Sequence, residues 1–221
     1  MILNSLLGNV VMTNYLIKIC GIRHAEMASQ AVKAGANLIG IIFHPLSPRY
    51  VGIEQAILIS QAVKASGALP VAVFVHHTAI EMQRICELTN INIVQLHGIA
   101  SRASHQLLPE EYQRIYVQTV SNQGELQTDE GLRYLDADRD LILVDHSQPG
   151  QGNKINQAFY YDLPFRWLLA GGLTAVNVAA TINDMQPNGV DVSSGVELKK
   201  GKKDIFLIRQ FIKSVRGNHV I

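Results

Sequence analysis

Eight short apolar runs, most of them followed by a segment with helical spacing, constrain the fold of this chain more than any other feature. The runs are rich in β-branched residues and continuously apolar, as expected for strands that are covered on both faces. Strands that alternate with helices form parallel sheets joined by right-handed crossovers. Eight such repeats in 221 residues favour a closed (β/α)8 TIM barrel, a fold that begins at roughly 200 residues. The predicted strands are 16–20, 38–43, 70–75, 91–96, 114–120, 141–144, 167–170 and 189–192.

The alternative α/β fold is a doubly wound open sheet. A dinucleotide-binding sheet of that kind carries Gly-x-Gly-x-x-Gly after its first strand, and no such motif follows residue 20. A chain of this length is also short for two ordinary domains. We therefore predict a single barrel domain over 15–221, preceded by a short N-terminal extension, 1–14, outside the barrel. The polar stretch 121–140 is expected to hold a loop and a short helix.

Three of the predicted helices begin with a capping residue. Thr78 and Glu81 have the spacing of a capping box, and Thr174 and Asp204 are placed to cap two later helices. A weaker helix is predicted near 101–108. The apolar stripe of the helix after Thr78 includes Cys86, so a place in the core accounts for this cysteine.

The composition argues against several functional classes. A formal net charge of +1 gives no broad electrostatic attraction to nucleic acid or to an anionic membrane surface. No segment is apolar for long enough to span a bilayer, and residues 1–13 fit a signal peptide poorly because no basic residue precedes their apolar part. Two cysteines make no disulfide framework, so we expect a protein of the reducing cytoplasm.

Reactive side chains are concentrated where the predicted strands end. In a parallel barrel the carboxyl ends of the strands meet at one rim, which is where α/β barrels place their active sites. Cys20 and Asp145 end the first and sixth strands, on different sides of the barrel mouth, where a base and an acid can move protons across a substrate. The alternatives are a buried apolar role for Cys20 and a loop cap for Asp145. The other residues expected at the rim are Arg49, His76, His77, His97 and Asp191.

Two turns rich in glycine and serine predict a phosphate site. Gly171 and Gly172 follow the seventh strand, and Ser193, Ser194 and Gly195 follow the eighth. Glycines let backbone N–H groups approach an oxyanion, and serines add hydroxyl donors. Barrels commonly bind phosphate with the loops after these two strands. The alternative is that both segments are ordinary turns.

A metal site is a further alternative because imidazoles are good zinc ligands. None of the histidines forms an i, i+4 pair, and two adjacent side chains in extended backbone point to opposite faces. We therefore predict no metal, and a Cys–His hydrolase also lacks a local signature. The histidines considered are His44, His76, His77, His97 and His146.

Taken together, these segments resemble the phosphoribosylanthranilate isomerase family, barrel enzymes of tryptophan biosynthesis. The resemblance extends from residue 16 to residue 216, and the order of the matching segments makes it specific. The segments are KICGI (18–22), PLSPRYV (45–51), VAVFV (71–75), VQLHG (94–98), LVD (143–145), LAGGL (169–173), DVSSGVE (191–197) and GKKD (201–204).

The resemblance implies an Amadori rearrangement, in which N-(5-phosphoribosyl)anthranilate becomes 1-(2-carboxyphenylamino)-1-deoxyribulose 5-phosphate. By analogy Cys20 is the general base and Asp145 the general acid. Arg49 orients the substrate, and His97 and Asp191 line the pocket. The chemistry is proton transfer, so it implies neither a metal nor a redox cofactor. The expected partner is a small phosphosugar, with no nucleic acid or membrane, and the expected assembly is a monomer or weak homodimer.

The chain departs from the family pattern after the sixth strand. The family usually has Gly-x-Gly-Lys followed by an aromatic residue, whereas this chain reads GQGNK over 150–154 with Ile155 next, and His146 stands where a small residue is commoner. The departures concern how this loop covers the substrate and how its residues set the acidity of Asp145. Two other readings stay open: another phosphosugar barrel, such as an epimerase or an indole-glycerol-phosphate-synthase-like enzyme, and a non-catalytic barrel that binds phosphosugars.

Overall fold

A computed structural model describes residues 15–120, 130–146 and 165–217. The expected N-terminal extension, 1–14, and nearly all of the loop predicted over 146–153 lie outside these ranges. The strands are β1 (Leu16–Cys20), β2 (Leu38–Ile42), β3 (Leu69–Phe74), β4 (Ile93–Leu96), β5 (Gln113–Val120), β6 (Asp140–His146), β7 (Trp167–Ala170), β8 (Gly189–Val192), β9 (Glu197–Lys199) and β10 (Lys202–Lys203).

Helices lie between most of these strands. The α-helices are α2 (Ala25–Ala34), α3 (Ile53–Ala65), α4 (Ala79–Thr89), α5 (Ile99–Ala103), α7 (Val178–Met185) and α8 (Ile205–Gly217). Short 3-10 helices are η2 (His105–Leu107), η3 (Glu130–Tyr134) and η4 (Ser194–Val196). No helix within the described ranges is long and apolar enough to cross a membrane.

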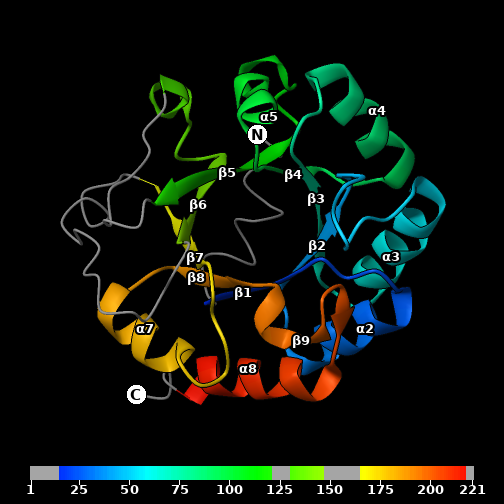
Figure 1. Cartoon of the computed structure of the whole chain (residues 1–221). Helices are drawn as coiled ribbons and strands as arrows, with labels where there is room; N and C mark the ends of the chain where they lie inside the picture. The colour runs from blue at the N-terminus through cyan, green and yellow to red at the C-terminus, as the bar shows by residue number, and fades with distance from the viewer. Residues whose placement is uncertain (1–14, 121–129, 147–164, 218–221) are drawn as a thin grey trace.

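Strands β1 to β8 form a closed parallel barrel in chain order, with the helices arranged around it (Figure 1). The barrel closes where β1 pairs with β8, and Lys18 lies opposite Asp191 in this pairing. The structure thus confirms the predicted (β/α)8 barrel. Because every strand runs in the same direction, the residues that follow the eight strands share one rim.

The barrel strands bury both faces. Along β1, Leu16, Lys18 and Cys20 occupy alternate positions on the inner face, while Ile17 and Ile19 pack outward in the larger core under the helices. Cys20 is the last inward residue of β1, so it lies at the mouth of the barrel. The inner core consists of Leu16, Leu38, Val71, Ile93, Ile115, Val117, Leu141, Leu143, Leu168 and Ala170.

Two of the three predicted helix caps are confirmed. The hydroxyl of Thr78 accepts a hydrogen bond from the backbone N–H of Glu81, and the Glu81 carboxylate accepts one from the backbone N–H of Thr78. Asp204 accepts from the backbone N–H of Leu207 at 2.9 Å and so caps α8. The prediction for Thr174 is wrong, because its hydroxyl accepts from Val176 in a local turn and α7 begins only after Asn177.

Two other elements differ from expectation. The helix predicted over 101–108 is α5 followed by η2, because Ser104 and Leu107 donate to carbonyls three residues back and so tighten the chain into 3-10 geometry. The antiparallel hairpin β9–β10 was not expected, since it is short and lysine-rich. It follows β8 after the short helix η4 and therefore lies beside the barrel mouth.

Candidate active site

A pocket of about 500 Å³ opens at the carboxyl ends of the strands. It is lined by the residues that end β1, β6 and β8 and by those that follow β2, β4 and β7. Most of the sequence-predicted site residues meet here. The lining includes Cys20, Arg49, His97, Asp145, Gly171, Gly172, Asp191, Ser193 and Ser194.

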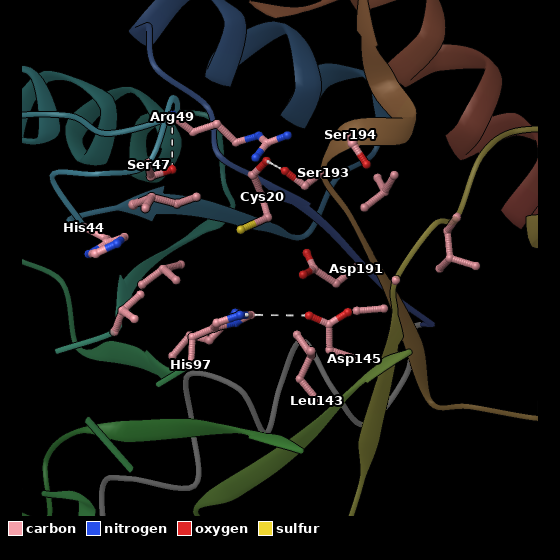
Figure 2. Close-up of a pocket in the computed structure, with 18 of the residues that line it drawn as sticks. Cys20, His44, Ser47, Arg49, His97, Leu143, Asp145, Asp191, Ser193 and Ser194 are labelled. Carbon is pink, nitrogen blue, oxygen red and sulfur yellow. Dashed lines mark hydrogen bonds and ion pairs between the residues drawn. The ribbon is translucent and has the colours of Figure 1, made fainter. Parts of the chain in front are cut away.

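Cys20 and Asp145 enter this pocket from opposite sides, and Asp191 lies between them (Figure 2). Cys20 is 6 % exposed, and burial raises the pKa of its thiol. Lys18 and Lys203 act against this shift and favour the thiolate, whereas Asp191 disfavours it. Two ammonium groups and a carboxylate therefore act in opposite directions on the ionisation of this thiol.

Asp145 lies beside His97, and a dashed line joins the two side chains below Cys20 in Figure 2. Its Oδ2 atom is 4.0 Å from the imidazole Nε2. Burial lowers the pKa of His97, and the nearby Asp145 carboxylate opposes that shift. Both side chains remain partly exposed. A carboxyl and an imidazole thus share the side of the pocket that faces the thiol.

Arg49 is held by a carboxylate from the unexpected hairpin. Its Nε and Nη2 donate to Glu197 at 2.7 and 2.8 Å, in the bidentate geometry that guanidinium and carboxylate favour. Lys203 donates to the same carboxylate at 2.8 Å and to the carbonyl of Ser193 at 2.9 Å. Burial opposes the charge on Glu197, but the hydrogen bonds from Arg49 and Lys203 outweigh it and lower its pKa to about 2.

The two predicted phosphate turns lie in contact. Gly171 and Gly172 have φ values of 94° and 54°, in the left-handed region that favours glycine. A Cβ on Gly195 would lie 1.8 Å from the carbonyl oxygen of Leu173, so only glycine allows the second turn to pack against the first. Gly195 therefore supports the turn without lining the pocket, and the Ser193 hydroxyl donates to the carbonyl of Cys20 at 3.1 Å.

Two predicted rim residues, His76 and His77, do not line the pocket. The His76 ring instead contacts His44, and the His77 ring contacts Phe74. The residues that the structure describes contain no group of three or more His, Cys, Asp or Glu side chains that could hold a metal ion.

The sequence of residues 17–214 matches the profile of the N-(5'phosphoribosyl)anthranilate (PRA) isomerase family. The chain belongs to this family. It is 38 % identical over 212 residues to N-(5'-phosphoribosyl)anthranilate isomerase 1, chloroplastic, of Arabidopsis thaliana, covering 92 % of this chain and 76 % of that protein.

Solved structures of phosphoribosylanthranilate isomerases superpose over nearly the whole chain. The crystal structure from Thermotoga maritima gives a TM-score of 0.79 at 34 % identity, and it covers 92 % of this chain and 100 % of that one. A second structure, in complex with reduced 1-(o-carboxyphenylamino)-1-deoxyribulose 5-phosphate, gives 0.78 at 32 % identity with the same coverage.

Within this phosphoribosylanthranilate isomerase fold, sequence reasoning missed four polar residues around the pocket: Lys18, Gln95, Glu197 and Lys203. Lys18 and Gln95 carry a readable signal, because each stands two positions before a predicted site residue and alternate strand residues share a face. The Oε1 atom of Gln95 is buried, and none of the described residues donates to it. Glu197 and Lys203 gave no such signal, because their hairpin was not predicted.

Proposed function

We propose that this protein catalyses the Amadori rearrangement of N-(5-phosphoribosyl)anthranilate to 1-(2-carboxyphenylamino)-1-deoxyribulose 5-phosphate, a step of tryptophan biosynthesis. One observation carries the proposal: in a chain of the isomerase family, a thiol and a carboxyl from Cys20 and Asp145 face each other across one pocket. The pocket volume of about 500 Å³ falls in the range that holds small organic ligands.

The reaction requires an acid on one side of the sugar and a base on the other. In the proposed first step, Asp145 gives its proton to the furanose oxygen. The bond between C1 and that oxygen breaks, and the lone pair of the anthranilate nitrogen forms the C1=N bond of a protonated Schiff base. In the second step the Cys20 thiolate takes the proton from C2, and the C2–H electrons form a C1=C2 bond while the nitrogen recovers its lone pair. The resulting enol then becomes the ketose by tautomerisation.

The environment of each group suits its proposed role. Burial around Cys20 by itself raises the pKa of the thiol, and the ammonium groups of Lys18 and Lys203 act in the opposite direction and favour the thiolate. Burial lowers the pKa of His97, which favours the neutral imidazole and so weakens the ion pair between His97 and Asp145. We propose that His97 and Asp191 bind the sugar portion through hydrogen bonds.

We assign the two ends of the substrate to two different parts of the rim. Arg49, fixed by Glu197, is proposed to orient the anthranilate carboxylate. The phosphate is proposed to bind at the turns after β7 and β8, where backbone N–H groups can approach it closely. These turns contain Gly171, Gly172, Ser193, Ser194 and Gly195.

The decisive experiment follows the loss of phosphoribosylanthranilate fluorescence in the presence of EDTA. We expect turnover by the wild-type protein, a fall of roughly 10²- to 10⁴-fold for Asp145→Asn, and a severe fall for Cys20→Ser because a hydroxyl is a much weaker base than a thiolate. Cys86→Ala is the matched control, since Cys86 lies on the buried face of α4. This variant should retain turnover.

Other outcomes would contradict specific parts of the proposal. A wild-type protein that binds the phosphosugar without turnover would be a non-catalytic barrel. Full turnover by Cys20→Ser would remove this thiol from the mechanism, and full turnover by Asp145→Asn would leave that carboxyl a structural role.

We also propose that the protein works in the cytoplasm as a single barrel domain, monomeric or weakly dimeric. One observation supports the compartment: both Cys20 and Cys86 are free and buried, as is usual where thiols remain reduced. Light scattering at several protein concentrations measures the assembly directly.

A further inference from the structure

A lysine lies inside the barrel directly beneath the proposed base. Lys18 precedes Cys20 by two residues on the inner face of β1, and its side chain is 0 % exposed. Its ammonium donates to Asp191 Oδ1 at 3.0 Å, across the pairing of β1 with β8. Lys18 is not one of the residues that line the pocket.

The ammonium of Lys18 also borders the sulfur of Cys20. The two side chains flank Gly40, which lies opposite Cys20 in the pairing of β1 with β2. A Cβ at Gly40 would lie 2.7 Å from the sulfur and 3.1 Å from the Lys18 nitrogen, so both atoms face the same small space. The Lys18 ammonium favours the thiolate of Cys20, and the absence of a side chain at Gly40 leaves room for the two groups to approach each other.

We propose that Lys18 is a positioning residue that stabilises the thiolate of Cys20 from within the barrel while Asp191 anchors its ammonium. The inference rests on the proposed function, in which Cys20 acts as the base. A buried ammonium requires a compensating anion, and Asp191 supplies it. When Cys20 ionises, Lys18 lies between two anions, and its ammonium stabilises part of the added charge on sulfur.

Other charged groups also face the thiol. Lys203 on β10 favours the thiolate, Asp191 on β8 disfavours it, and Arg49 on the loop after β2 lies within electrostatic reach. Burial raises the pKa of Cys20, and Lys18 is the strongest of the charged groups that act against this rise. Because Lys18 outweighs Asp191 at the sulfur, removal of both charges should still disfavour the thiolate.

The test measures how fast iodoacetamide alkylates Cys20 as a function of pH, with the labelled peptide quantified by mass spectrometry. The thiolate is the reacting species, so the midpoint of the profile reports its ionisation in the absence of substrate. We expect Lys18→Met to raise the midpoint by at least about one pH unit, a tenfold loss of rate below it. Asp191→Asn should lower the midpoint, and Lys18→Arg should restore most of the wild-type profile.

Removal of Lys18 alone leaves Asp191 buried without its partner and can prevent folding. The double variant Lys18→Met/Asp191→Asn avoids this, and its midpoint should still lie above that of the wild type. Arg114→Met/Asp140→Asn is the matched control, because it neutralises another buried ion pair, between β5 and β6, and should not move the midpoint.

An unchanged midpoint in the double variant, or an equal shift in the control, would overturn the inference. Failure of the proposed function gives a different pattern, because full turnover by Cys20→Ser contradicts the base assignment whatever the alkylation profile shows. An inactive Cys20→Ser protein combined with an unmoved midpoint in the double variant would reject only the role of Lys18.

Discussion

Glu197 shows how a single carboxylate organises one side of the pocket. It accepts from Arg49, from Lys203 and from the backbone N–H of Gly201, and its side chain is 4 % exposed. Arg49 and Lys203 would repel each other without the carboxylate between them. Glu197 therefore fixes the arginine that lines the pocket and one of the cations near Cys20.

The stabilising effect of Glu197 should depend on pH. Its pKa falls from the ordinary 4.5 to about 2 in the folded protein, so the folded state favours the ionised form and gains stability above the unfolded pKa. That gain is lost as pH falls through the interval from 4.5 to 2. We expect wild type to exceed Glu197→Gln in urea midpoint at pH 7, and the gap to narrow steadily as the pH approaches 2. A gap that stays constant over this interval would contradict the prediction.

Individual site residues were predictable where the strand pattern placed them. Cys20, His97, Asp145 and Asp191 all lie at or just after strand ends, and alternation sets their direction. The ion pairs around the pocket were not predictable from the sequence. Arg49 and Glu197 are 148 residues apart, and Lys18 and Asp191 are 173 residues apart. Only the closed barrel brings such distant positions together.

Among the elements, α4 has the most complete local start signal. The Thr78 hydroxyl and the Glu81 carboxylate satisfy backbone N–H groups at the helix start that would otherwise lack partners. This arrangement is read directly from residues three positions apart, which is why the sequence predicted it.

Removal of the Thr78 hydroxyl should destabilise the protein measurably. We expect Thr78→Ala to cost about 1 kcal/mol, equivalent to a fall of roughly 2–4 °C in Tm for a protein of this size. Ile80→Ala in the same helix is the control, because Ile80 is 79 % exposed and its truncation should change stability by less than about 0.5 kcal/mol. Calorimetry that finds equal Tm values for the two variants would refute a capping role.

Elements with a strong periodic pattern were predicted well, and elements without one were not. The eight barrel strands are apolar runs, and the structure contains all eight. The hairpin β9–β10 has only five strand residues, four of which are charged, so its pairing depends on contacts with Arg49 and Ser193 rather than on local hydrophobicity. The Thr174 prediction failed for a related reason, since its hydroxyl satisfies a turn instead of a helix end.

At the scale of the molecule, α8 covers the seam where the barrel closes. It contacts both α2 and α7, and Figure 1 shows it running between them. Arg216 near its end donates to the carbonyl of Gly35 after α2. The helix buries Ile208, Phe211, Ile212 and Val215, and so joins the last repeat of the fold to the first.

Two phenylalanines of α8 allow a matched test of this covering role. Phe211 is 0 % exposed, whereas Phe206 is 69 % exposed. Phe211→Ala should cost about 3–5 kcal/mol, which corresponds to a fall in Tm of roughly 10 °C, while Phe206→Ala should stay within about 0.5 kcal/mol of wild type. Similar melting temperatures for both variants would show that α8 contributes little to closure.

The ion pair between Lys18 and Asp191 lies on that same seam, between the first and last strands of the barrel. The partner that anchors the lysine is made late in synthesis, after most of the chain has left the ribosome. The two charged neighbours that act on the Cys20 thiol from β1 and β8, Lys18 and Asp191, therefore come together only when the final strand docks. The electrostatic surroundings of this thiol and the closed barrel are thus completed in the same event.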